Sequence, residues 1–302
     1  MRSSAASDVY KRQTPENAEE AAANGCARST VKETYEFILG DLNKAIELLA
    51  NTKKTRSDKR YVSLDVAYGI RARVHLTMHN YADALKDAEA ALASTSSVPY
   101  SSAAVSKPTF IDIEDASWMW GILITDKDRV STTGICNFPS HMGSLNYGYA
   151  SVGGWRRISP KLYNQIPESD VRKGWFLDDT GVSVNLPAAA QAYITKKGAP
   201  VYTQVKYGPM NDEWGSNNNA TDVILMRVEE MYLIKAEAQA MNNDVSGGVN
   251  TLNSFVNTYR DPSYKCTATT GEAVQEAVWH QRRIEFWGEG LACLLYTSPR
   301  PR

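Results

Sequence analysis

Apolar residues recur at helical spacing over residues 222–244, and the rest of the chain can be organised around this segment. One stripe of residues at i, i+3 or i+4 spacing consists of Leu225, Val228, Tyr232 and Ala236. A neighbouring stripe consists of Ile224, Met231, Ile234, Ala238 and Met241. A helix that is apolar over more than half of its circumference is expected to lie between other helices in a layered stack. Thr221 or Asp222 offers an N-cap oxygen, and Asn242 and Asn243 offer a helix stop.

A second segment repeats this pattern, because residues 67–91 align with residues 231–255. The matched positions are Tyr68 with Tyr232, Ile70 with Ile234 and Ala72 with Ala236. The second helix of each copy then carries a small residue at the same offset, Ala84 in one and Gly248 in the other. Small residues at these offsets, on a helix–turn–helix of about 34 residues, are typical of tetratricopeptide repeats. The alternative is two unrelated amphipathic hairpins, and the matched offsets favour the repeat.

Helical periodicity extends to further segments on both sides of the chain's middle. The predicted helices cover residues 31–50, 63–79, 81–94, 247–259 and 271–287. Between them, residues 96–220 are rich in Ser, Gly, Pro, Asn and aromatic residues, so loops and short helices are expected. Within that part, residues 118–124 and 202–207 are candidate strands and residues 159–167 a candidate short helix.

The predicted fold class is therefore mainly α, with a tetratricopeptide-repeat scaffold and an irregular, loop-rich lobe inserted between repeats. We assign residues 30–95 and 221–290 to the scaffold and residues 96–220 to the lobe, all within one domain of residues 14–292. Residues 1–13 and 293–302 have no such pattern, and we interpret them as a non-native flank and tail around an internal fragment.

Composition excludes several classes of function. The net charge is −1, from 33 basic and 34 acidic residues, so there is no electrostatic basis for nucleic-acid binding. No run of about 18 apolar residues is present, which argues against a membrane-spanning helix. The motifs GxSxG, HExxH, the P-loop and GxGxxG are absent, so we predict no enzyme activity, no catalytic residues and no cofactor.

Several polar residues are candidates for metal ligands or catalytic groups. Cys26, Cys136, Cys266 and Cys293 show no metal-binding spacing, although a Cys136–Cys266 disulfide stays open. His75 and His79 are spaced i, i+4 without an evident third ligand, so ordinary helix-surface histidines are the favoured interpretation. The acidic groups are better explained as solvated loop acids than as calcium sites or carboxylate pairs: Asp112, Glu114 and Asp115, and Asp126 and Asp128. We predict no metal site.

The candidate ligand site lies in the aromatic stretch of residues 146–157, the densest in Tyr, Trp and Gly. Sugars bind by stacking C–H faces on aromatic rings, and polar side chains take their hydroxyls. Tyr147, Tyr149 and Trp155 are the candidate rings, and Asn146 and Arg156 the candidate polar partners, with His141 nearby. The alternative is that these rings only cover the helical scaffold.

Four motifs, in order along residues 14–290, resemble one family. They read YVSLDVAYGIRARVHLTMHNYADALKDAEAAL, SPKLYNQIPESDVRKGWF, DVILMRVEEMYLIKAEAQAMNN and QRRIEFWGEG. In these motifs the chain resembles SusD/RagB-like nutrient-binding lipoproteins of the bacterial outer membrane. The family's signal peptide, lipobox cysteine and C-terminal segment have no counterpart in this sequence.

The resemblance implies a non-catalytic, cell-surface protein of starch or other glycan utilisation. Such a protein captures oligosaccharide or polysaccharide and passes it to a SusC-like TonB-dependent transporter. It implies a location on the extracellular face of the outer membrane, lipid-anchored in the full-length protein. The alternative function is a tetratricopeptide adaptor that binds only another protein. A glycoside hydrolase would need two facing carboxylates, and the sequence indicates no candidate pair.

Overall fold

The computed structural model describes residues 28–52, 55–128, 131 and 137–291, and the chain forms two compact units that divide after Thr52. The first unit contributes helix α3 (Val31–Asn51), which matches the predicted helix of residues 31–50. A capping box starts it: the Thr30 side chain accepts a hydrogen bond from the Glu33 amide, and the Glu33 carboxylate accepts one from the Thr30 amide. This helix is described by itself.

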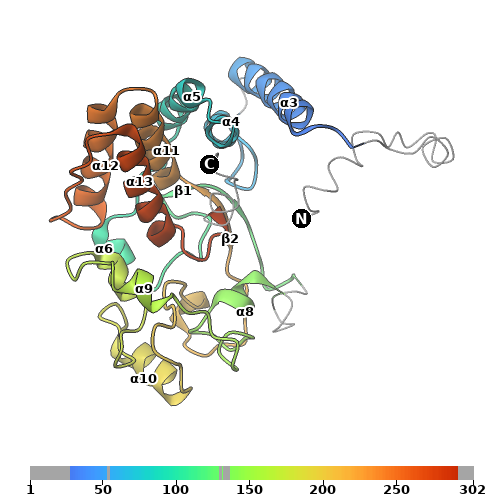
Figure 1. Ribbon diagram of the computed structural model, residues 1–302. Coiled ribbons are helices and arrows are strands. Elements are labelled where there is room, and N and C mark those ends of the chain that lie inside the picture. Colours follow the sequence, from blue (N-terminus) through green and yellow to red (C-terminus); the bar gives the residue numbers. More distant parts are fainter. Residues whose placement is uncertain (1–27, 53–54, 129–130, 132–136, 292–302) are drawn as a thin grey trace. The chain divides into compact units, whose positions relative to one another are not determined.

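The second unit is built on helical hairpins, as the repeat pattern predicts (Figure 1). Helices α4 (Leu64–Thr77) and α5 (Tyr81–Ser94) form one hairpin, and α11 (Val228–Met241) and α12 (Val245–Tyr259) form the other. Helix α11 also packs on α5 and on α13 (Gly271–Glu285). The fold is mainly helical, with a tetratricopeptide-like scaffold and an irregular lobe inserted between its two parts.

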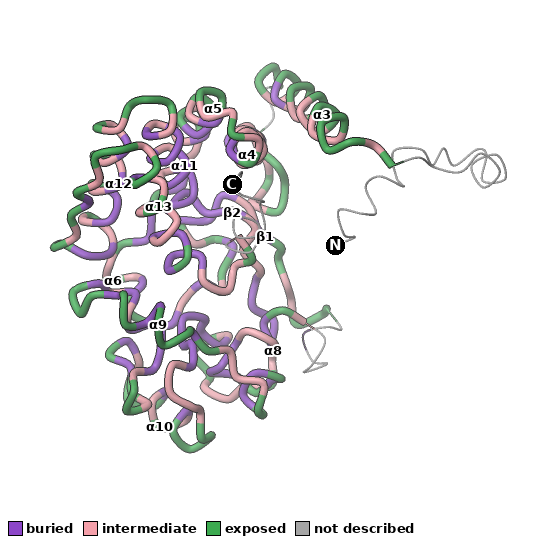
Figure 2. The backbone as a smooth tube through the Cα atoms, in the orientation of Figure 1, coloured by how far each residue is buried: buried purple, intermediate pink, exposed green. Residues whose placement is uncertain are grey.

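Helix α11 is buried on two sides, which confirms the prediction from its apolar circumference (Figure 2). Met231, Ile234 and Ala238 pack in the cluster formed with α4 and α5. The opposite residues of α11 pack in the cluster formed with α12 and α13; they include Leu233, Ala236 and Ala240. One face of α11 therefore packs against α4 and α5, and the opposite face packs against α12 and α13.

The small residue at Gly248 is required by the close approach of α12 to α11. A Cβ added there would lie 2.7 Å from the Ala236 carbonyl oxygen and 2.8 Å from the Ala240 Cβ. The equivalent residue of the first hairpin, Ala84, is fully buried. The residues that defined the repeat in the sequence are thus the ones that set the interhelical distance.

The predicted start of this helix is wrong. Residues Val223–Arg227 form strand β2, which pairs antiparallel with β1 (Trp118–Ile122), and α11 begins only at Val228. Leu225 and Ile224 therefore lie outside the helical stripes, because strand pairing and the β-branched Val223 and Ile224 favour extended backbone here.

Asp222 is not an N-cap. Its carboxylate accepts hydrogen bonds from the backbone amides of Ile113 (2.8 Å) and Ile124 (2.7 Å), which fixes two loop segments of the lobe. At the other end of α11 the prediction is confirmed. The helix ends at Met241, Asn242 is the C-cap, and Asn243 adopts a left-handed backbone with φ of 67°.

The lobe consists of short elements joined by ordered loops. They are α6 (Ser102–Val105), α8 (Phe138–Met142), α9 (Pro160–Tyr163), η1 (Val171–Trp175), α10 (Ala188–Lys196) and η2 (Met210–Asp212). The candidate strand at residues 118–124 is confirmed as β1. Residues 202–207 form isolated bridges to Thr109, Arg157 and Phe176 instead of a continuous strand, so that prediction is wrong.

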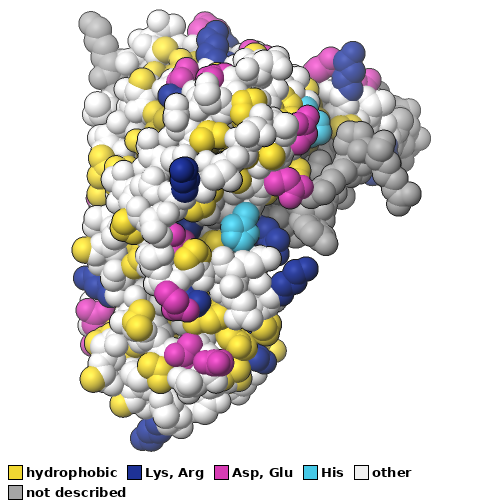
Figure 3. Space-filling model, turned by 60° about the vertical axis from the view of Figure 1, so that its left-hand side comes forward, with side chains coloured by type: hydrophobic (Ala, Val, Ile, Leu, Met, Phe, Trp, Pro, Cys, Tyr) yellow, Lys and Arg dark blue, Asp and Glu magenta, His cyan; other side chains and the backbone are white. Residues whose placement is uncertain are grey.

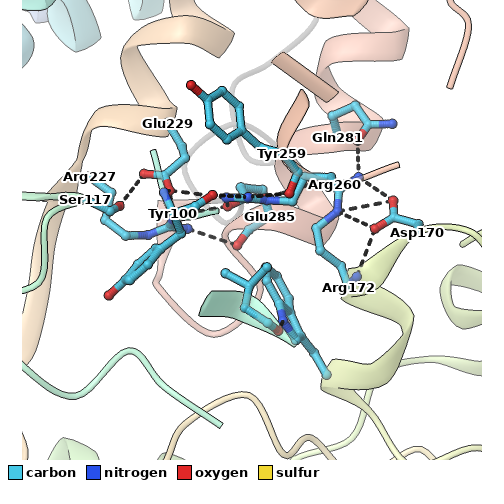
Figure 4. A network of polar contacts seen from close by, with 12 residues as sticks. Tyr100, Ser117, Asp170, Arg172, Arg227, Glu229, Tyr259, Arg260, Gln281 and Glu285 are labelled. Atoms are coloured by element: carbon cyan, nitrogen blue, oxygen red, sulfur yellow. Dashed lines mark hydrogen bonds and ion pairs between the residues drawn. The ribbon is translucent and has the colours of Figure 1, made fainter. Parts of the chain in front are cut away.

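A buried cluster of ion pairs joins the lobe to the scaffold (Figure 4). Its centre is Glu285, the last residue of α13, and its oxygens contact three guanidinium groups. Arg260 from the end of α12 lies at 2.8 Å, Arg227 from β2 at 3.0 Å and Arg172 from η1 at 3.3 Å. Glu229 adds a second carboxylate, 3.1 Å from Arg227 and 3.2 Å from Arg260.

Positive and negative charges in this cluster are balanced, because a buried charge without a counterion would be strongly destabilising. Arg172, Arg227, Arg260, Glu229 and Glu285 all have fully buried side chains. Burial acts to raise the pKa of Glu285, but the surrounding arginines, Arg260 first, outweigh it and hold that pKa well below its ordinary value. Asp170, at 2.6 Å from Arg172, supplies the third negative charge, and the adjoining buried pair of Lys206 and Glu289 adds one charge of each sign, with Glu289 2.8 Å from Arg227. Removing one partner would leave a buried charge without its counterion.

We predict that Glu285→Gln lowers the free energy of unfolding by about 3–5 kcal/mol at neutral pH. Because the folded-state pKa of Glu285 is depressed, its contribution is complete above the ordinary glutamate pKa, about 4.3, and declines as the pH falls below it. Denaturant unfolding from pH 7 to pH 3 should therefore show the gap between wild type and variant narrowing in acid. The exposed Glu272→Gln is the control, and a gap that does not change with pH would contradict this role.

We predict that Gly248→Val lowers the free energy of unfolding by about 1–3 kcal/mol, because the new side chain meets the backbone of α11. Gly40→Val is the matched control: it also lies inside a helix, but a Cβ there meets nothing within 4 Å. The measurement is the loss of stability of each variant in thermal unfolding. Equal losses for Gly248→Val and Gly40→Val would contradict a steric clash between α12 and α11.

Candidate ligand-binding site

The predicted aromatic loop is anchored to a second loop of the lobe. The Gly215 amide donates to the Leu145 carbonyl (2.8 Å), and the Tyr147 amide donates to the Ser216 carbonyl (2.7 Å). Between them, the side-chain amide of Asn146 donates to the Asn219 side-chain oxygen. Asn146 is only 2% exposed. The structure therefore places Asn146 beneath the surface, where it holds the backbone of the neighbouring tyrosine in place.

Tyr149 lies on this anchored loop and is 43% exposed. The ring stacks on His141, with centroids 4.7 Å apart and planes 25° apart, and the Arg156 guanidinium carbon lies 5.8 Å from the ring centroid. Arg156 Nε donates to the His141 carbonyl oxygen at 3.1 Å. A Cβ on Gly154 would lie 2.6 Å from the Tyr149 ring, so glycine is needed there. Tyr149, Arg156 and His141 thus form one group.

Tyr147 is 49% exposed and forms a second group with residues that the sequence did not nominate. The Lys197 ammonium lies 5.4 Å from the Tyr147 ring and 5.7 Å from the Tyr193 ring. The Tyr193 hydroxyl donates to the Asn146 carbonyl oxygen at 3.2 Å. Tyr193 and Lys197 come from helix α10 and its C-cap, and the alanine-rich run after Pro187 is the sequence signal that could have located them.

Trp155 differs from these exposed rings in its packing. It is half-buried against the small core of the lobe, which consists of Leu145, Leu177, Ala190, Ile194 and Val205. Its ring therefore contributes to holding the lobe together, and it does not cover the helical scaffold. Among the five predicted residues, the structure exposes the rings of Tyr147 and Tyr149 and buries the side chain of Asn146.

The acidic and histidine candidates have local structural partners. His75 lies 3.8 Å from Asp87, and His79 stacks beside Tyr81. Asp112 accepts from the Glu114 amide, and Asp128 accepts from the Thr125 amide. Within the described ranges, no three His, Cys, Asp or Glu side chains lie close enough to hold a metal ion. Cys266 is a free, buried thiol, and Cys26, Cys136 and Cys293 lie outside the described residues.

The arrangement suits recognition of a neutral polyol. Exposed tyrosine rings can stack on C–H faces, while Arg156 and Lys197 beside them offer hydrogen-bond donors. Figure 3 shows basic and acidic side chains interspersed on one face of the molecule, in keeping with the balanced charge. None of the described helices has the length and apolar character that crossing a bilayer requires.

Comparison with known proteins agrees with the fold. Residues 160–291 match the sequence profile of the SusD family. This range includes the second half of the lobe, helix α11 and the Glu285 cluster. No curated protein matches the sequence significantly.

Solved structures of SusD-like proteins share this fold. A SusD-like carbohydrate-binding protein from Bacteroides vulgatus is 25% identical, with a TM-score of 0.71 over 91% of this chain and 53% of its own. A SusD superfamily protein from Bacteroides thetaiotaomicron is 22% identical, with a TM-score of 0.68 over 90% of this chain and 56% of its own. A putative sugar-binding protein from B. vulgatus is 24% identical, with a TM-score of 0.65 over 89% and 54%. The chain thus spans about half the length of these relatives.

We predict that Asn146→Ala loosens the loop under Tyr147 without unfolding the protein. Losing a buried hydrogen bond between two side-chain amides costs about 1–3 kcal/mol. We expect this loss to lower the free energy of opening this one loop, because the bond anchors only that loop. Hydrogen exchange of the Tyr147 and Gly215 amides should accelerate accordingly. Gln165→Ala, at an exposed position, is the control. Unchanged exchange at Tyr147 would show that Asn146 does not anchor the loop.

Proposed function

We propose that this chain is the saccharide-binding part of a non-catalytic, cell-surface nutrient-binding protein. The observation that carries the proposal is the pair of exposed rings, Tyr147 and Tyr149, on an anchored loop of a SusD-like lobe. Two of the similar structures are described as carbohydrate-binding or sugar-binding proteins, which supports the same ligand class.

Binding would combine ring stacking with a few charged donors. The exposed part of each tyrosine ring would stack on a sugar ring, and the nearby Arg156 and Lys197 would donate to hydroxyl groups. Since Tyr149 and Arg156 are held against His141 before the ligand arrives, little conformational entropy is lost in ordering them. Trp155 acts in this proposal by supporting the lobe, and Asn146 by fixing the backbone of Tyr147.

The proposed partner is a SusC-like TonB-dependent transporter, to which the saccharide is passed. The full-length protein is proposed to lie on the extracellular face of the outer membrane, held there by a lipid anchor, with residues 14–292 as one SusD-like domain. The match of residues 160–291 to the SusD family supports these statements. Co-purification of the full-length protein with the transporter, together with an empty glycan array, would favour a protein-only adaptor instead.

We predict that Tyr149→Ala and Tyr147→Ala each weaken saccharide binding by about 1–3 kcal/mol, the usual effect of removing a central aromatic contact. Isothermal titration with oligosaccharides first identified on a glycan array gives the measurement. Tyr61→Ala is the matched control, because Tyr61 is 55% exposed and belongs to a different surface segment.

The same titration tests the absence of catalysis. The bound oligosaccharide should be recovered intact, with no new reducing ends after prolonged incubation. Equal affinity in the wild type and in the Tyr147→Ala/Tyr149→Ala double variant would remove this loop from the binding site. Release of shorter products by the pure protein would overturn the non-catalytic assignment.

A further inference from the structure

A separate cleft of about 530 Å³ opens on the lobe. It is lined by residues of α9 and η1, by the loop of residues 178–185, and by Tyr202. None of the five residues predicted as the ligand site lines it. Its volume falls within the range of about 300–1,000 Å³ that is typical of small-molecule sites. The cleft is therefore large enough for a short saccharide.

Two buried side chains present polar groups to this cleft without a partner. Tyr163 is 8% exposed and Asn185 is 7% exposed. Within the described part of the chain, the Tyr163 hydroxyl makes no hydrogen bond. The Asn185 amide nitrogen donates to the carbonyls of Val105 (3.3 Å) and Val171 (3.2 Å), while its oxygen accepts none from the described residues. Both residues line the cleft, so these two unpaired atoms are accessible to a ligand that enters it.

An aromatic wall stands beside these groups. The Tyr202 ring lies 5.1 Å from the Tyr163 ring, at an interplanar angle of 56°. Tyr202 has φ of 65°, a left-handed conformation that bulky residues avoid. Backbone hydrogen bonds hold it there: its amide donates to the Leu177 carbonyl (3.0 Å), and its carbonyl accepts from the Ile158 amide (3.1 Å). The fold thus maintains a half-buried ring at this edge of the cleft.

The charged residues of the cleft are mostly acidic. Glu168, Asp178 and Asp179 line it together with a single lysine, Lys173, which forms an ion pair with Glu168 at 2.5 Å. Asp170 also lines it but is neutralised in the buried cluster around Glu285. Asp179 is exposed and forms no ion pair with any described residue. The cleft therefore has an excess of negative charge.

The same carboxylates act on the hydroxyl group of Tyr163. Burial, followed by the nearby carboxylates of Asp178, Glu168 and Asp179, raises the pKa of Tyr163 to about 12. An anionic group such as a uronate or a sulfate would be repelled here, and an ammonium group would be attracted.

We propose that this cleft is a second saccharide-binding site, with a preference for a sugar unit that carries a protonated amino group. Tyr202 would supply the stacking surface, the Tyr163 hydroxyl and the Asn185 oxygen would take ligand donors, and Asp178 and Asp179 would attract the ammonium. The inference rests on the proposed function, since it assumes that the lobe binds saccharides. It adds the location of a second binding site and the charge of the preferred ligand.

The experiment compares three tetrasaccharides with the full chain by isothermal titration: a glucosamine, an N-acetylglucosamine and a galacturonate oligomer. All titrations use the Tyr147→Ala/Tyr149→Ala background, so that the loop site does not contribute. We expect the glucosamine oligomer to bind about fivefold tighter than the N-acetylated one at low salt, the value of one close charge interaction in water. This preference should shrink near 1 M salt, where the Debye length is about 3 Å.

Three variants separate the cleft from general effects. Tyr163→Phe removes only an unpartnered hydroxyl, so it should weaken binding while thermal stability stays equal or rises. Tyr202→Gly removes the ring at a backbone conformation that glycine adopts freely, and it should weaken binding of the neutral and the amino oligomer alike. Asp179→Asn should reduce the preference for the amino sugar, whereas Glu213→Gln, an exposed acid outside the cleft, should not.

The outcomes distinguish the two proposals. Saccharide binding that is unaffected by Tyr163→Phe and Tyr202→Gly overturns the cleft site and leaves the proposed function standing on the tyrosine loop. Galacturonate binding as tightly as glucosamine at low salt overturns the charge preference. No binding of any saccharide, with the loop tyrosines intact as well, overturns the proposed function and the cleft assignment together.

Discussion

The buried carboxylate of Glu285 is the contact on which the geometry of the second unit depends. It stands at the end of α13 and receives guanidinium groups from three separate segments: the lobe (Arg172), strand β2 (Arg227) and the end of α12 (Arg260). Burying so many charges is costly, and such clusters contribute more reliably to a unique arrangement than to net stability. The cluster therefore sets where the lobe stands on its helical scaffold.

The scaffold and the lobe are stabilised in different ways. In the scaffold, small residues such as Gly248 let α12 approach α11, so that both faces of α11 find helical neighbours. In the lobe, short elements are held by specific hydrogen bonds, as at Asp222, and exposed aromatic rings stand on loops fixed in this way. Fixed loops on a rigid support are where binding groups are usually found.

The scaffold could be predicted from the sequence because periodicity and small residues report local packing directly. Ala84 and Gly248 identified the repeat, and the structure shows both at interhelical contacts. The start of α11 could not be predicted, since a partner strand distant in sequence decides that residues 223–227 are extended. The same limit applies to the lobe: Asn146 reads as an exposed polar residue in the sequence, and only its pairing with Asn219 shows that it is buried.

The most direct test of this account is amide hydrogen exchange across the whole chain, with and without a saturating oligosaccharide chosen by array. Saccharide binding by the lobe predicts slower exchange in residues 145–157 and 160–205, with α4, α5 and α11 unchanged. Protection confined to those scaffold helices, with the lobe exchanging as in the free protein, would contradict it.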